Sequence, residues 1–165
     1  MKLSIGNKIP DASLIMSGTN GPKKIFLSDF TKGKKTILIG MPGAFTPTCS
    51  NDHFPGLIRN VNNFLEMGIN EILCLVSNDI HVINEWGRQT GAFQAGIKIL
   101  ADPNSEFIRK TGLEFSAPDV GLLNRIQRVF LYIDNQIIKH IQLEEKRGSC
   151  SLTSGDNIFS ILKSI

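Results

Sequence analysis

Cysteine, tryptophan and tyrosine are scarce in this sequence, and long apolar runs are absent. The 165 residues include three cysteines, one tryptophan and one tyrosine. No stretch approaches the roughly 18 consecutive apolar residues that a membrane-spanning helix requires. The mixed polar and apolar segment 1–10 does not have the form of a signal peptide or an anchor. We therefore expect no membrane association and a cytoplasmic location.

A marked excess of charge of either sign is also lacking. Lysine and arginine number 18 against 15 aspartates and glutamates, a formal net charge of +3 at neutral pH. The basic residues are scattered, and aromatic residues make up only 7% of the chain. These features exclude the basic, aromatic surface typical of nucleic-acid binding, so no nucleic-acid partner is expected.

The rest of the composition is that of an ordinary globular protein. Apolar residues make up 41% of the chain and charged residues 20%, which is enough apolar material for a core of its own. No repeat, low-complexity segment or linker divides the sequence. We expect residues 1–165 to form a single domain.

Continuous apolar segments predict buried strands, and apolar residues at helical spacing predict the helices between them. The expected strands are 36–39, 72–76, 97–100 and the two arms of a hairpin, 129–133 and 137–143, which turns at 134–136. The expected helices are 54–65 with Gly68 as a stop, 80–91 capped by Ser77, Asn78 or Asp79, a short helix opening at Asp102-Pro103, and a closing helix capped by Thr153 or Ser154. This order predicts an α/β fold with a mixed central sheet and helices on both faces, and a thioredoxin-like sheet fits it best.

Cys49 lies where chemistry is expected in such a sheet. The loop 40–47 follows the strand 36–39 and places Cys49 on the first turn of the next helix. In open α/β sheets, ligands bind where strand ends meet helix N-termini. Free backbone N–H groups and the helix dipole favour an anionic sulfur there, which would make the thiol reactive. A lone cysteine at a helix start is more often a packing residue. The neighbouring residues must therefore show whether Cys49 is reactive.

Those neighbours form the pattern Pro-x-x-x-Thr-x-x-Cys, which consists of Pro42, Thr46 and Cys49. Further matching motifs are Cys49-Ser50-x-x-His53-x-Pro55-Gly56, Val76-Ser77-Asn78-Asp79, Glu85-Trp86, Leu100-Ala101-Asp102-Pro103 and an arginine-headed strand at Arg128. With these motifs in this order, the chain resembles the peroxiredoxins, specifically the peroxiredoxin-five or type II subfamily, over nearly its full length.

The resemblance implies a thiol-dependent peroxidase for antioxidant defence that uses no metal or cofactor. Its Cys49 thiolate would attack hydrogen peroxide or a small alkyl hydroperoxide and become a sulfenic acid. Pro42 would shield the site, while the Thr46 hydroxyl and the Cys49 backbone N–H would donate to the sulfur or the peroxide oxygens. The family's catalytic arginine corresponds to Arg128, with Arg125 as competitor. The other interpretation of Arg128 is a solvated strand end.

Two more residues near the motif leave alternatives open. His53 follows Cys49 by four positions on the same helical face. It either supports the pocket from behind or is a helix histidine bonded to a neighbour, and we do not expect it to act as a general base. Phe45 either lines the pocket wall or belongs to the core. The cysteines and histidines show no spacing typical of a metal site.

The other two cysteines bear on how the sulfenic acid is reduced. Cys74 lies within an apolar strand and is expected to be an inert buried thiol. Cys150-Ser151-Leu152 is similar to the context of the resolving cysteine in subfamily members that resolve within one chain, but Cys150 stands about two positions out of register. If Cys150 does not resolve, glutathione with glutaredoxin, or thioredoxin, must reduce Cys49 directly. The resemblance also implies a homodimer joined through loops beside the site.

Two competing functions follow from the residues alone. A disulfide oxidoreductase would need a second cysteine three positions after Cys49, where Asp52 stands. A sensor, in which oxidation of Cys49 alters a contact with a partner, stays open as an added role. Sustained peroxide consumption with a thiol reductant distinguishes an enzyme from a sensor, because a sensor stops after one equivalent.

Overall fold

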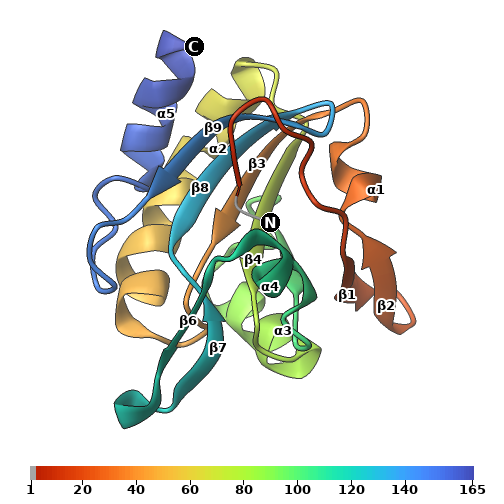
Figure 1. Cartoon of the computed structure of the whole chain (residues 1–165), viewed down its shortest axis with the longest axis vertical. Coiled ribbons are helices and arrows are strands. Elements are labelled where there is room, and N and C mark those ends of the chain that lie inside the picture. Colours follow the sequence, from red (N-terminus) through yellow and green to blue (C-terminus); the bar gives the residue numbers. More distant parts are fainter. Residues whose placement is uncertain (1–2) are drawn as a thin grey trace.

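A seven-stranded mixed sheet runs through the computed structural model, which describes residues 3–165 (Figure 1). In spatial order its strands are β2 (Gly21–Phe26), β1 (Ser13–Gly18), β5 (Lys98–Ala101), β4 (Glu71–Val76), β3 (Lys35–Gly40), β8 (Val129–Asp134) and β9 (Ile137–Leu143). The three central strands β5, β4 and β3 are parallel, and the remaining pairs are antiparallel. The predicted mixed sheet with an antiparallel pair at one side is confirmed.

Helices cover both faces of this sheet. Within residues 3–165 they are α1 (Ser28–Thr31), the π-helical segment η1 (Thr48–His53), α2 (Phe54–Glu66), α3 (Ile80–Gln89), α4 (Glu106–Thr111), the 3₁₀ turn η2 (Pro118–Val120) and α5 (Gly155–Ser164). Helices α2, α3 and α5 pack on one face, and α4 packs on the other. None of the helices in this described range has the length and apolar character that crossing a membrane requires.

The central strands are buried on both faces, which explains their continuous apolar sequences. In β3, Ile37 and Ile39 belong to the core cluster under α2, α3 and α5, whereas Leu38 between them belongs to the cluster on the α4 side. Successive side chains of a strand point to opposite faces, so both faces require apolar residues here. The sheet thus forms a rigid support, and the loop after β3 begins at its end.

The predicted turns and caps are confirmed where local chemistry specifies them. Asn135 and Gln136 both adopt positive φ, at 45° and 70°, in the turn between β8 and β9. Asp79 is the residue that caps α3, because its carboxylate accepts hydrogen bonds from the N–H groups of His81 and Val82 at 2.9 and 3.1 Å. Ser154 caps α5 through the N–H of Asn157.

Other boundaries differ from the sequence prediction. The helix expected to open at Asp102-Pro103 begins instead at Glu106, and Asp102 accepts hydrogen bonds from the N–H groups of Glu106 and Ile108. In α2, helical spacing from Phe54 and Val61 predicts an apolar face that includes Leu65, but Leu65 is 51% exposed and Phe64 is buried in its place. Both 64 and 65 satisfy helical spacing, so only packing against α5 and the sheet decides between them.

Four strands were not predicted. They are the N-terminal hairpin β1–β2 and a separate antiparallel ribbon of β6 (Glu114–Ala117) and β7 (Leu122–Ile126). β2 is exposed at five of its six positions, and β7 has one buried residue. β2 and the β6–β7 ribbon lie at sheet edges and carry almost no apolar alternation, which is the signal that sequence reasoning uses.

Candidate active site

Cys49 lies just beyond the end of a central strand, on a helical turn that faces the sheet. β3 ends at Gly40, and the loop that follows leads into η1, of which Cys49 is the second residue. The sequence predicted a helix start here but not its wider π-helical form, which is frequent at functional sites. The Cys49 side chain is fully buried. Access to its sulfur therefore depends on the side chains of the surrounding loops.

The guanidinium of Arg128 lies directly on this sulfur. Arg128 precedes β8, which pairs with β3 so that Val129 lies opposite Gly40. Its Nη2 donates a hydrogen bond to the Cys49 Sγ at 3.2 Å, and the side chain is only 4% exposed. The alternative of a solvated strand end is wrong for Arg128. A buried cation at this distance favours negative charge on the sulfur.

Arg125, the competing arginine, contacts the loop instead of the sulfur. Its Nη1 donates to the carbonyl oxygen of Pro42 at 3.3 Å and to Asn78 Oδ1 at 3.1 Å. Asn78 Oδ1 also accepts the N–H of Ala44 at 2.9 Å. A Cβ atom on Gly43 would lie 2.6 Å from Arg125 Nη1, so this close approach requires glycine. Arg125 and Asn78 thus hold the loop in which Pro42 lies.

His53 lies behind Arg128. His53 Nδ1 contacts Arg128 Nη1 at 2.8 Å, and His53 Nε2 contacts the Thr153 carbonyl oxygen at 2.7 Å. A guanidinium can only donate and a carbonyl can only accept, so both bonds require the neutral ring with its proton on Nε2. Burial, reinforced by the Arg128 charge, lowers the pKa of His53 to about 3. The ring therefore stays neutral near pH 7. His53 is bonded to neighbouring residues and also supports the site from behind Arg128, so the two alternatives from the sequence are combined in one residue.

Thr46 and Phe45 form the outer part of the loop. Thr46 Oγ1 donates to the Gly43 carbonyl oxygen at 2.8 Å, which differs from the predicted bond to sulfur because Gly43 lies within the same tight turn. The hydroxyl oxygen keeps the capacity to accept a hydrogen bond. Phe45 has φ +58° and is 51% exposed. The core interpretation of Phe45 is wrong.

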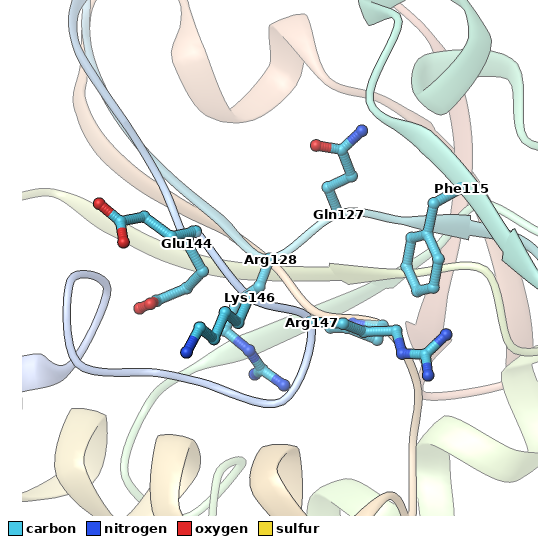
Figure 2. Close-up of a pocket in the computed structure, with 8 residues that line it drawn as sticks. Phe115, Gln127, Arg128, Glu144, Lys146 and Arg147 are labelled. Carbon is cyan, nitrogen blue, oxygen red and sulfur yellow. The ribbon is translucent and has the colours of Figure 1, made fainter.

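Pro42, Arg128 and Arg147 each line two neighbouring cavities. One has a volume of about 350 Å³ and is bounded by Phe45 and Thr46 on the side of the loop. The other, of about 210 Å³, is shown in Figure 2. There Arg147 lies on the segment below Arg128 and extends toward the Phe115 side of the cavity. Arg128, whose guanidinium contacts the buried sulfur, thus lines both cavities together with Arg147.

Comparison with known proteins shows which family has this architecture. Residues 4–157 match the family model described as Redoxin. Peroxiredoxin-2E, chloroplastic, from Arabidopsis thaliana is 36% identical over 164 residues, which cover 97% of this chain and 69% of that protein. Peroxiredoxin-2D from the same plant is 34% identical over 161 residues, covering 97% and 98%. The chain belongs to the Redoxin family and is a peroxiredoxin.

A solved structure supports the same conclusion for the fold. The structure of reduced Prx3 from Vibrio vulnificus in complex with H₂O₂ has a TM-score of 0.90 and 31% identity, and the match covers 97% of this chain and 99% of that one. The predicted thioredoxin-like fold and the resemblance to the type II peroxiredoxins are confirmed. This peroxiredoxin is a thiol-dependent peroxidase of antioxidant defence.

The other two cysteines of the peroxiredoxin occupy different environments. Cys74 on β4 is fully buried, and burial raises its pKa well above the ordinary value. Cys150 lies half-buried as a free thiol between β9 and α5. Burial raises the pKa of Cys150, and the nearby charge of Arg128 opposes this effect. Among residues 3–165, no group of three or more His, Cys, Asp or Glu side chains could hold a metal ion.

Sequence reasoning assigned no positioning role to three residues that hold the site in place. Asn78 was considered only as a helix cap, although the motif Val76-Ser77-Asn78-Asp79 was noted. Trp86 donates to Ser50 Oγ at 2.9 Å and so contacts the residue after Cys49. Glu144 anchors the segment that carries Cys150 through bonds to Thr153. Glu144 follows an exposed strand end, and nothing local distinguishes it from other surface glutamates.

Proposed function

We propose that Cys49 is the peroxide-reducing nucleophile of this peroxiredoxin and that Arg128 stabilises its thiolate. The observation that carries the proposal is the 3.2 Å contact from Arg128 Nη2 to Cys49 Sγ within a buried site. A cation held there lowers the cost of the sulfur's negative charge before the reaction. It also donates toward the oxygen on which charge develops during the reaction.

The chemical step is a displacement at a peroxide oxygen. The Cys49 thiolate forms an S–O bond as the O–O bond breaks, and the electron pair leaves with the distal oxygen. That oxygen takes up a proton and departs as water from hydrogen peroxide or as an alcohol from an alkyl hydroperoxide. Thr46 accepts the O–H of the bound peroxide, and the Cys49 N–H donates to it. Pro42 excludes a competing donor, because its nitrogen carries no proton.

Two routes can restore the reduced enzyme. In the first, the Cys150 sulfur attacks the sulfenic acid of Cys49, a disulfide forms and water leaves. Thioredoxin or glutaredoxin then reduces that disulfide. The bond from Thr48 Oγ1 to the Gly148 carbonyl oxygen, at 3.1 Å, supports this route because it joins η1 to the Cys150 segment. In the second, the glutathione thiol attacks the sulfenic acid of Cys49, a mixed disulfide forms and water leaves, and glutaredoxin then reduces that mixed disulfide.

The proposal extends to the state of the whole protein. The central sheet combines strands from both ends of the chain, which supports treating residues 1–165 as one domain. Large exposed apolar side chains lie beside the site at Phe45, Val120 and Leu123, and Phe45 and Val120 border the same cavity. They support a homodimer formed through this surface. The cytoplasmic location expected from the sequence remains part of the proposal.

Replacing Cys49 tests the central assignment. We expect Cys49→Ser to abolish peroxide turnover with a thiol reductant, and Cys74→Ser to retain it. Mass spectrometry after one equivalent of peroxide then identifies the route of reduction. A Cys49–Cys150 disulfide indicates the first route, and a sulfenic acid trapped by glutathione indicates the second. Turnover that persists in Cys49→Ser contradicts the proposal.

A further inference from the structure

A continuous chain of buried contacts leads from the Cys49 sulfur to the segment that carries Cys150. Arg128 bonds Cys49 through Nη2 and His53 through Nη1, and His53 in turn bonds the carbonyl oxygen of Thr153. Arg128 is 4% exposed, and Cys49, His53 and Thr153 are fully buried. Thr153 lies three residues after Cys150. The position of the guanidinium therefore depends on the position of this segment, because the His53 ring bonds both.

The orientation of the guanidinium depends strongly on that ring. Arg128 Nε is buried and has no hydrogen-bond partner among residues 3–165. The bonds from Nη1 to His53 and from Nη2 to Cys49 therefore orient the group, and only the bond to His53 is independent of the reacting sulfur. Losing an acceptor for a buried guanidinium is costly, because the N–H would stay unpaired away from water. His53 is thus placed to position Arg128 rather than to exchange a proton.

Glu144 fastens the other end of the chain of contacts. Its Oε1 accepts the Thr153 N–H at 2.6 Å and the Thr153 hydroxyl at 2.8 Å, while Oε2 accepts the Ser149 hydroxyl at 2.8 Å. The Glu144 N–H itself donates to the Arg128 carbonyl oxygen at 3.2 Å. One carboxylate therefore holds the chain on both sides of Cys150. A segment held in this way has a defined closed position from which it can be released.

We propose that Glu144 and His53 couple the closed position of the Cys150 segment to the orientation of Arg128 on Cys49. With the segment closed, Thr153 holds His53, and His53 holds the guanidinium on the sulfur. When the segment opens, the Thr153 carbonyl leaves, the ring loses its anchor and Arg128 loses its fixed orientation. The reactivity of Cys49 toward peroxide is then lower in the open state. This inference rests on the proposed roles of Cys49 and Arg128.

The test measures how fast Cys49 reacts with hydrogen peroxide in Glu144→Ala. Stopped-flow fluorescence of Trp86, which bonds Ser50 next to Cys49, follows oxidation. All variants carry Cys150→Ser, so that disulfide formation does not contribute. We expect Glu144→Ala to slow the reaction about tenfold, the effect of losing one buried hydrogen-bond partner. Glu145→Ala removes the same charge from the next, exposed residue and is expected to change the rate less than about twofold.

A double-mutant cycle separates coupling from general damage to the fold. The side-chain oxygen of His53→Asn can accept the bond from Arg128, but this shorter side chain cannot also reach Thr153. In the H53N background we therefore expect Glu144→Ala to have less than about a twofold effect. Equal slowing by Glu144→Ala in both backgrounds overturns the proposal, as does an unchanged rate in Glu144→Ala alone.

A further variant distinguishes this inference from the function on which it rests. Arg128→Met removes the guanidinium and keeps an apolar side chain of similar length. If Arg128→Met reacts at the rate of the wild type, the proposed function of Arg128 fails, and the coupling fails with it. If Arg128→Met is slow while Glu144→Ala is normal, only the coupling is wrong.

Discussion

At the scale of single residues, the buried His53 matters most, because its two hydrogen bonds position Arg128. His53 must accept a bond from a cation on one edge and donate to a carbonyl on the other, which only the neutral Nε2–H ring can do. Spacing alone predicted that His53 shares a helical face with Cys49. It could not indicate the partners, because Arg128 is 75 residues away and Thr153 is 100 residues away along the chain.

The free energy of unfolding should depend on pH through His53. Its pKa falls from 6.5 to about 3 on folding, so between these values the unfolded chain binds the proton more readily. The free energy of unfolding is then insensitive to His53 above pH 6.5 and decreases as the pH falls below it, by up to about 1.4 kcal/mol per pH unit. Urea denaturation at a series of pH values measures this slope.

A matched variant and a restricted pH range isolate this effect. Burial raises the pKa of Glu71, but its bonds to Lys34 and Lys98 outweigh this and lower it below 4.5, so its stabilising contribution is lost only as the pH falls below that value. Between pH 6.5 and 4.5 the slope of the wild type should therefore exceed that of His53→Asn. Equal slopes in this range would show that His53 is not held neutral by the fold.

At the scale of elements, the loop after β3 depends on side chains from two other parts of the chain. Asn78 follows β4, and Arg125 comes from β7; together they bond the backbone at Pro42 and Ala44. The sequence motif marked the loop as important because its prolines, glycines and threonine lie close together in the chain. It did not indicate this bracing, since β7 was not predicted at all.

Replacing Gly43 should disturb the loop without touching the reacting groups. In Gly43→Ala the new Cβ would lie 2.6 Å from Arg125 Nη1, so the guanidinium must move away from Pro42 and Asn78. We expect the rate of Cys49 oxidation to fall about tenfold, because the loop loses one or more of the hydrogen bonds that position it. Stopped-flow measurements at several peroxide concentrations determine this rate constant.

Gly56→Ala in α2 is the matched control, because a Cβ there makes only an ordinary contact, 3.7 Å from its nearest neighbour. This substitution should leave the rate within about twofold of the wild type, since alanine is the better helix former. A Gly43→Ala enzyme as fast as Gly56→Ala would mean that the contacts of Arg125 do not affect the site.

At the scale of the whole molecule, the exposed apolar side chains near the site predict self-association. Val120 and Leu123 are 63% and 58% exposed on and beside the β6–β7 ribbon. We expect the wild type to sediment as a dimer and the double variant Val120→Asp, Leu123→Asp to sediment as a monomer, because buried aspartates would lie unpaired in the interface. Analytical ultracentrifugation over a range of concentrations measures this.

The control for this prediction lies at the other end of the sheet. Leu65→Asp places the same charge on a residue that is 51% exposed near the end of α2, and it should sediment as the wild type does. A wild type that is monomeric at every concentration would contradict the proposed homodimer.

The sequence by itself determined the α/β order, the short segments 77–79 and 153–154 in which the caps of α3 and α5 lie, and the reactive loop around Cys49. These depend on spacings of a few residues, and such short-range geometry is largely the same in any fold. Only the tertiary structure decided between Arg125 and Arg128, which differ by three positions at the junction of β7 and β8. Which of them meets the sulfur depends on the pairing of β8 with β3, which brings Arg128 into contact with Cys49, 79 residues earlier in the chain. The same holds for the bond from Glu144 to Thr153, because the partners of a buried polar group are chosen by the folded chain as a whole.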